Sequence, residues 1–111
     1  MHKNLRFLYI TTENKEQALD LGKKIIEQDL AACVNIIPGM ESIYKWENSI
    51  QMAQETILVV KTHISKVQPV TRFILDNHTY DCPCVMSLNI AEDEGNPDYL
   101  TWLFEESTER Q

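Results

Sequence analysis

The sequence has few of the residues that mark disulfide-rich, low-complexity or membrane-spanning proteins. Its 111 residues include three cysteines, three glycines and four prolines. Three cysteines are too few for a disulfide framework and odd in number, so we expect Cys33, Cys82 and Cys84 to be reduced thiols. No apolar run approaches the roughly 20 residues that cross a bilayer, and the first ten residues lack the apolar stretch of a signal peptide. We therefore expect a cytoplasmic protein that does not bind membranes.

Basic residues are also scarce. Lys and Arg number 10 against 17 Asp and Glu, which gives a formal net charge of −7. The longest basic run is the pair Lys23 and Lys24. Nucleic-acid-binding proteins neutralise phosphates with clustered Lys and Arg. The charge balance therefore argues against nucleic acid as a partner.

Motifs of familiar catalytic sites are missing. The sequence contains no Gly-rich phosphate loop, no HExxH and no CxxC. The acidic run at 92–94 is typical of a solvated loop. We therefore expect no enzymatic activity.

What is present is an alternation of strand and helix patterns within one expected domain, residues 1–111. Short runs of β-forming residues predict four strands, and the second is expected to bend at Pro38-Gly39. A turn at 47–49 joins the second and third strands in a hairpin. The predicted strands span 5–11, 32–46, 56–61 and 84–90.

Three helices are predicted from capping signals and apolar spacing. Asn14 with Gln17 and Ser65 with Gln68 resemble capping boxes, and the helices that follow are expected to end near residues 29 and 77. Asn96 followed by Pro97 predicts an N-cap and first turn. The residues of this last helix that we expect to face inward are Tyr99, Leu100, Leu103 and Phe104.

This order of elements predicts the fold class. A βαββαβ order with right-handed crossovers closes most simply into an α+β, ferredoxin-like sandwich, here with an extended hairpin between the second and third strands and an added C-terminal helix. Two helices cover one face of the sheet and the other face stays uncovered. Because large bare apolar patches are uncommon on soluble monomers, apolar side chains there would require oligomerisation.

The bent second strand carries candidate binding residues. Met40, Ser42, Tyr44 and Trp46 share one face, and the residues between them take the other. Tyr44 and Trp46 form a pocket wall or an interface anchor in one interpretation, and ordinary cross-strand packing in the other. Lys61 ends the strongest β run. It is expected to pair with an anionic ligand, with Glu41 or Glu47, or to mark the solvent edge of the strand.

The segment 78–84 concentrates metal-capable side chains. His78, Cys82 and Cys84 are soft or borderline ligands suited to Cu(I) or Zn(II), but a fourth ligand of a structural zinc site is missing. In the alternative interpretation these cysteines are small hydrophobic residues. Cys33 lies in an apolar run and is expected in the core.

Three longer segments resemble one known family. They are LAACVNIIPGMESIYK at 30–45 followed by Trp46-Glu47, ETILVVKT at 55–62, and NPDYLTWL at 96–103. Together they resemble the CutA family of divalent-cation tolerance proteins. The resemblance implies a ferredoxin-like subunit in an intertwined homotrimer, similar in architecture to PII nitrogen-signalling proteins, with a role linked to copper and other divalent cations. The family's intersubunit cleft positions correspond to Tyr44, Trp46, Lys61 and Tyr80.

The sequence departs from the family at its metal-binding positions. In copper-binding members the resemblance implies a cysteine in the first strand and a His-His pair after the second helix. This chain has Ile10, Asn77 and His78 there. Cys84 also stands where the family usually has Glu. A substitute copper site would therefore consist of His78, Cys82 and Cys84.

Two functional hypotheses stay open. The first is a trimeric divalent-cation tolerance protein that responds to metal ions, binds copper or another divalent cation and has no catalytic activity. The alternative is a PII-like sensor that binds an anionic ligand at the subunit interface, for which Lys61 and Arg72 are the available cations. An acylphosphatase-like enzyme on the same fold would need an Arg in the loop after the first strand, which reads Thr12-Glu13-Asn14.

Overall fold

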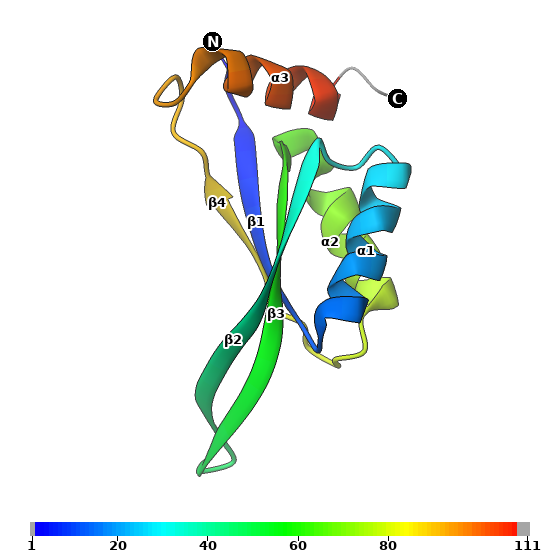
Figure 1. Cartoon of the computed structure of the whole chain (residues 1–111), viewed down its shortest axis with the longest axis vertical. Coiled ribbons are helices and arrows are strands. Elements are labelled where there is room, and N and C mark those ends of the chain that lie inside the picture. Colours follow the sequence, from blue (N-terminus) through cyan, green and yellow to red (C-terminus); the bar gives the residue numbers. More distant parts are fainter. Residues whose placement is uncertain (1, 109–111) are drawn as a thin grey trace.

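The computed structural model describes residues 2–108 and has the predicted order of elements (Figure 1). The elements are β1 (Leu5–Thr12), α1 (Lys15–Glu27), β2 (Cys33–Trp46), β3 (Ser49–His63), the 3₁₀ turn η1 (Ile64–Lys66), α2 (Val67–Asn77), β4 (Val85–Asn89) and α3 (Pro97–Thr108). Each predicted strand is found. The third strand is longer than predicted, and the prediction missed residues 49–55 because they carry no run of β-branched residues.

The four strands form one antiparallel sheet in the order β2-β3-β1-β4, and α1 and α2 cover one of its faces (Figure 1). This arrangement confirms the ferredoxin-like α+β fold. Alternate strand residues and one stripe of each helix meet between the two layers. The fully buried members of this core include Leu8, Ile10, Leu21, Ile25, Leu58, Val60, Val70 and Ile74.

The helix starts agree with the predictions in two cases of three. The Asn14 side chain accepts from the Gln17 backbone N–H at 2.8 Å, and Asn96 accepts from the Asp98 N–H at 3.0 Å. The capping box at Ser65 is wrong. There the His63 side chain accepts from the Ser65 N–H at 3.1 Å and begins η1, which leads directly into α2.

The β2–β3 hairpin projects far beyond the rest of the molecule (Figure 1). Its register shifts between Ile37 and Met40, where Pro38 and Gly39, with φ of 82°, form the predicted bulge. The two turn residues 47 and 48 both have positive φ, as in the two-residue turns that suit hairpins. The radius of gyration is 14.8 Å, against about 13 Å for a compact chain of this length. The hairpin accounts for this elongation.

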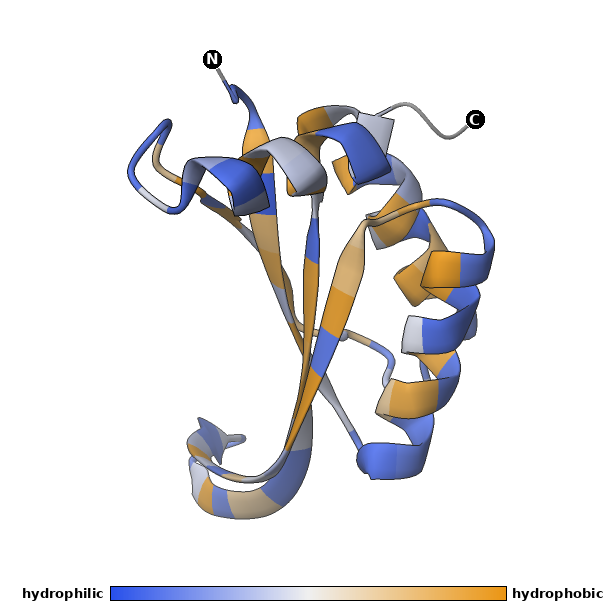
Figure 2. Ribbon diagram, turned by 45° about the horizontal axis from the view of Figure 1, so that its top comes forward, coloured by the Kyte–Doolittle hydropathy of each residue, from blue (hydrophilic) through white to orange (hydrophobic). Residues whose placement is uncertain are grey.

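The face of the sheet away from α1 and α2 is covered at one end. Here α3 packs Leu100 and Leu103 against Leu5 of β1. Of the residues expected inward on α3, Tyr99 is an exception, because it is 40% exposed. The rest of this face bears apolar side chains from three strands, and Figure 2 shows hydrophobic positions along these strands. They include Phe7, Tyr9, Ile57, Val59, Met86 and Leu88.

Within residues 2–108, no helix has the length and apolar character required to cross a bilayer.

Candidate functional site

Of the four predicted cleft residues, the structure places Lys61 far from Tyr44 and Trp46 within one protomer. Tyr44 and Trp46 lie near the hairpin tip, where Tyr44 pairs with Gln51 of β3. Lys61 lies ten residues farther along β3, paired with Cys33. At about 3.3 Å per residue this is roughly 33 Å of strand. A cleft that contains all four residues therefore requires more than one copy of the chain.

Lys61 is held by an aromatic residue of α3. Its Nζ donates to the Tyr99 hydroxyl at 2.9 Å and lies 5.2 Å from the centre of that ring. The Tyr99 ring in turn contacts the Trp102 ring at a centroid distance of 5.7 Å. Within one protomer Lys61 does not pair with Glu41 or Glu47, because both glutamates lie on the projecting part of the hairpin. Lys61 also lies inside its strand, since β3 continues to His63.

Tyr80 belongs to a polar cluster at the base of the projecting hairpin. Its hydroxyl donates to Oε2 of Glu55 at 2.9 Å, and Ser42 donates to Oε1 of the same carboxylate at 2.6 Å. Burial, together with the nearby Glu55, raises the pKa of Tyr80 to about 12. The phenol therefore stays protonated at neutral pH and acts as a donor.

Sequence reasoning missed Glu55 and Ser42 as members of this cluster. Glu55 pairs with Met40 across the hairpin, which places it on the strand face that carries Ser42 and Tyr44. The signal in the sequence was the alternation of side chains along β3, which, counted back from the apolar run, assigns Glu55 to one face of the strand. The register shift at the bulge, which decides which residues meet, cannot be read from that alternation.

His78 organises the loop that carries Tyr80. Its Nδ1 accepts from the Tyr80 backbone N–H at 3.0 Å, so in the neutral ring Nε2 carries the proton and donates to the Thr11 carbonyl at 2.8 Å. The two rings contact each other at a centroid distance of 4.5 Å. Both ring nitrogens are thus used to fix the loop against β1.

The predicted metal ligands do not converge on one point. Cys82 is exposed, whereas Cys84 is half-buried. Burial, and then the charge of Glu55, raises the pKa of the Cys84 thiol, which opposes formation of the thiolate that binds metal. In the part of the chain from 2 to 108, no group of three His, Cys, Asp or Glu side chains could hold a metal ion. His78, Cys82 and Cys84 of a single chain therefore do not fit copper.

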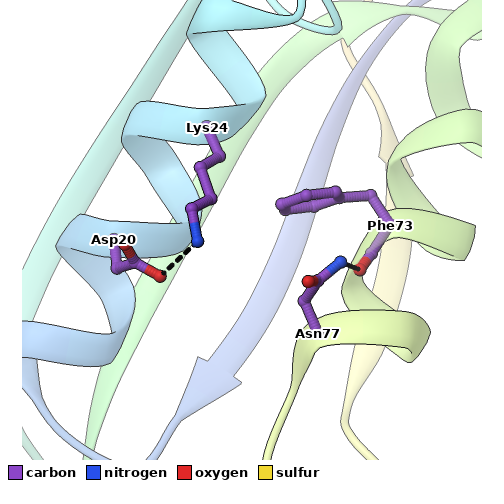
Figure 3. Close-up of polar contacts among 4 residues, drawn as sticks. All are labelled: Asp20, Lys24, Phe73 and Asn77. Carbon is purple, nitrogen blue, oxygen red and sulfur yellow. Dashed lines mark hydrogen bonds and ion pairs between the residues drawn. The ribbon is translucent and has the colours of Figure 1, made fainter.

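The other two family positions are also occupied by structural residues. Ile10 is fully buried in the core. Asn77 donates through Nδ2 to the Phe73 carbonyl at 2.8 Å and closes the last turn of α2 (Figure 3). Cys33, expected in the core, is half-buried on the sheet face away from the helices. These residues offer no ligand set to replace the missing one.

The projecting hairpin exposes large apolar side chains on both of its faces. Tyr44 and Trp46 are 48% and 64% exposed on one face, and Ile43, Ile50 and Met52 are 68–70% exposed on the other. This confirms the predicted division of β2 into two faces. A two-stranded hairpin is marginally stable alone in water, and a long exposed edge invites pairing. The hairpin therefore has the properties of a surface that another chain covers.

Comparison with known proteins identifies what the chain is similar to. Residues 6–106 match the model of the family described as CutA1 divalent ion tolerance protein. The chain is 43% identical over 96 residues to the chloroplastic protein CutA of Arabidopsis thaliana, covering 86% of this chain and 52% of that protein. It is 41% identical over 96 residues to the divalent-cation tolerance protein CutA of Thermus thermophilus, covering 86% of this chain and 91% of that protein.

Solved structures agree with this match. The crystal structure of CutA1 from Oryza sativa has a TM-score of 0.88 at 42% identity and covers 96% of this chain and 95% of that chain. A structure described as the periplasmic divalent cation tolerance protein CutA from Archaeoglobus fulgidus has a TM-score of 0.85 at 35% identity, with coverage of 93% and 98%. The chain spans about half the length of the plant relatives it matches.

Proposed function

We propose, from the premise that this chain belongs to the CutA family of divalent-cation tolerance proteins, that it supports tolerance of divalent cations as a homotrimer without catalytic turnover. The observation that carries the proposal is the distance along the β2–β3 hairpin between Tyr44 and Trp46 of β2 and Lys61 of β3. Residues that correspond to one cleft in the family lie at opposite ends of this protomer. These residues can form one cleft only if neighbouring subunits bring them together.

The trimer is supported by the distribution of exposed apolar side chains. The hairpin leaves Ile43, Ile50 and Met52 in solvent, and the open sheet face exposes Met86 and Leu88 by 52% and 48%. Full burial of such a side chain contributes about 1.5–3 kcal/mol. Five of these side chains in each of three subunits supply a large driving force for assembly.

The cleft in this proposal is built from two subunits. One subunit supplies Lys61, oriented by Tyr99, and its neighbour supplies Tyr44, Trp46 and Tyr80. Its wall is aromatic, its cation is the Lys61 ammonium, and its anion is Glu55, held by Tyr80. This pairing of opposite charges across a subunit boundary fixes the register of the two chains.

Inter-chain cross-linking tests the cleft. Lys61→Cys and Tyr44→Cys are introduced together into a chain whose three native cysteines are replaced by serine. We expect disulfide-linked dimers and trimers under mild oxidation. Positions 44 and 61 are too far apart to link within one chain, so each disulfide must join two chains. A control with Lys23→Cys, on the exposed side of α1, replaces Lys61→Cys and should not link. Monomer alone in both proteins would contradict the cleft.

Metal tolerance itself is tested in cells. A host whose own homologue is deleted is transformed with this chain and grown at graded Cu²⁺ concentrations. We expect restored growth with the native chain and reduced rescue with Trp46→Ala. Equal sensitivity of the native transformant and the empty-vector strain would refute the proposed role.

The copper ligands proposed from the sequence do not enter this function, because the trio does not fit a metal ion. We propose that the response to metal runs through the assembled trimer. A cytoplasmic location and a single folding unit for the whole chain are part of the proposal. Three unpaired cysteines support the reducing compartment, and fractionation of cells that express the chain tests it.

The second candidate is a sensor that binds an anionic ligand at the subunit interface. It is favoured by the Lys61 ammonium beside the exposed Tyr99–Trp102 ring pair. Thermal-shift measurements with metal ions and with nucleotides separate the two candidates. Stabilisation by nucleotides that Lys61→Gln removes would support the sensor.

A further inference from the structure

A small polar pocket lies at the end of the sheet opposite to the hairpin tip. It forms where β1 and β4 meet the loop after β4, and its volume is about 270 Å³. Arg6 of this pocket lies beside Thr62 in the sheet, whereas Trp46 lies beside Ser49. The pocket is thus separate from the Tyr44 and Trp46 side of the cleft. Its lining residues are Asn4, Arg6, Asn89, Ile90, Ala91 and Glu92.

Three residues that line this pocket, Asn4, Arg6 and Asn89, carry hydrogen-bond donors on their side chains. Arg6 and Asn89 are directly opposite in the β1–β4 register, so their Cβ atoms are about 5 Å apart on one face. Nη1 of Arg6 donates to the Leu5 carbonyl at 3.0 Å, which orients the guanidinium and leaves its other N–H groups available. Asn4 adds a second carboxamide. The group resembles the donor sets that hold planar or tetrahedral oxyanions.

The guanidinium is not neutralised by a neighbour. Between residues 2 and 108 no carboxylate forms an ion pair with Arg6, and the surface pair that does form joins Lys24 to Asp20 (Figure 3). Arg is the residue most suited to bidentate recognition of phosphate and carboxylate. An Arg that forms no ion pair and lies beside two carboxamides therefore favours an anion, although Glu92 of the same pocket opposes it.

Other cationic groups lie near Arg6. After burial, the charges of Arg6 and Lys66 lower the pKa of His63. His63 accepts at Nδ1 from Ser65, and its ring lies edge-on against Phe104 of α3. Lys66 donates to the Asp29 carbonyl at 2.8 Å, an uncharged acceptor. Arg6 and Lys66 thus both lie close enough to His63 to act on it electrostatically, while Glu92 of the pocket carries the opposite charge.

We propose that this pocket binds a small oxyanion, a phosphate or a carboxylate group, through the Arg6 guanidinium and the carboxamides of Asn4 and Asn89. Glu92 lies on the rim and is exposed, so its opposing charge is screened by solvent and salt. Removal of the Glu92 charge should strengthen anion binding, whereas removal of the Arg6 charge should weaken it. All residues that line the site belong to one chain.

The experiment is a titration of the full chain with inorganic phosphate, read from the ring resonances of His63 as the pH is varied. An oxyanion held at Arg6 offsets the charge that lowers the pKa of His63. We expect an upward, saturable shift of the His63 pKa. A parallel titration with acetate decides whether the pocket takes phosphate, carboxylate or both.

Three variants give the expected pattern. Arg6→Gln should weaken phosphate binding by at least about tenfold, the loss expected for charge-assisted hydrogen bonds. In Arg6→Gln the pKa of His63 should be higher than in the native chain before phosphate is added, and it should not change with phosphate. Glu92→Gln should bind several-fold tighter, and Lys23→Gln, on the outer side of α1, should match the native chain. Asn89→Thr provides a second loss variant if Arg6→Gln does not fold.

The proposal is overturned by any of three results. They are the absence of a saturable His63 shift with both anions, equal affinity in the native chain and Arg6→Gln, and weaker binding by Glu92→Gln.

Discussion

Truncation of Trp46 distinguishes a hairpin that stays in solvent from one that is covered by another subunit. The side chain is 64% exposed in the protomer. A Trp side chain buries about 200 Å² when it is fully covered, so about 130 Å² is available to an interface, which corresponds to about 3 kcal/mol at 25 cal/mol per Å². Removal of a side chain that stays on a free surface would change stability by no more than about 0.5 kcal/mol.

We therefore expect Trp46→Ala to lower the melting temperature by about 10 °C. We also expect a smaller fraction of trimer, and so a lower average mass, at low micromolar concentration. Differential scanning calorimetry and size exclusion with light scattering measure the two effects. Leu75→Ala is the matched control, because Leu75 is 57% exposed on α2, outside the hairpin. If both variants melt and elute like the native protein, Trp46 lies on a free surface and the reasoning fails.

Three further predictions concern the polar groups. Tyr80→Phe leaves the Glu55 carboxylate with the Ser42 donor alone, and we expect a loss of about 1 kcal/mol in the free energy of unfolding by urea denaturation; an unchanged midpoint would contradict it. Because the pKa of His63 is lowered in the native state, its stabilising contribution is present above the unfolded value of about 6.5 and is lost as the pH falls through the native pKa. His63→Asn, which keeps a cap acceptor, should lack this pH dependence in thermal melts, and identical profiles would show that His63 does not cause it. A Cys82→Ser, Cys84→Ser variant should bind Cu(I) with the affinity of the native chain in a chelator competition, whereas a tenfold loss would restore the cysteines to a copper site.

The sheet and its helix-covered core follow from patterns within each segment. Leu8 and Ile10 alternate with residues of the opposite face, and Ile25 and Ile74 lie on apolar stripes of their helices. The spacing of apolar residues shows which side of a strand or helix is buried, and in the fold these sides pack together in the core. The bulge at Pro38-Gly39 was predicted from backbone properties, since Pro fixes φ and lacks an N–H donor whereas Gly permits the positive φ that is found at Gly39.

The site was less accessible to sequence reasoning because it depends on contacts between distant segments. Tyr99 was expected inward from helical spacing, but its hydroxyl is bound by Lys61, 38 positions earlier in the chain. The His63 side chain begins η1 in place of Ser65 because the end of β3 orients its ring toward the Ser65 N–H. Glu55 and Tyr80 meet only after the hairpin and the loop following α2 have packed on β1.

The native mass of the protein tests the central claim most directly. We propose that assembly through the hairpin and the open sheet face brings Lys61 of one subunit next to Tyr44 and Trp46 of another. Sedimentation equilibrium at low micromolar concentration should give three times the mass of the 12.9 kDa chain. A single species at 12.9 kDa would contradict the trimer and, with it, the intersubunit cleft.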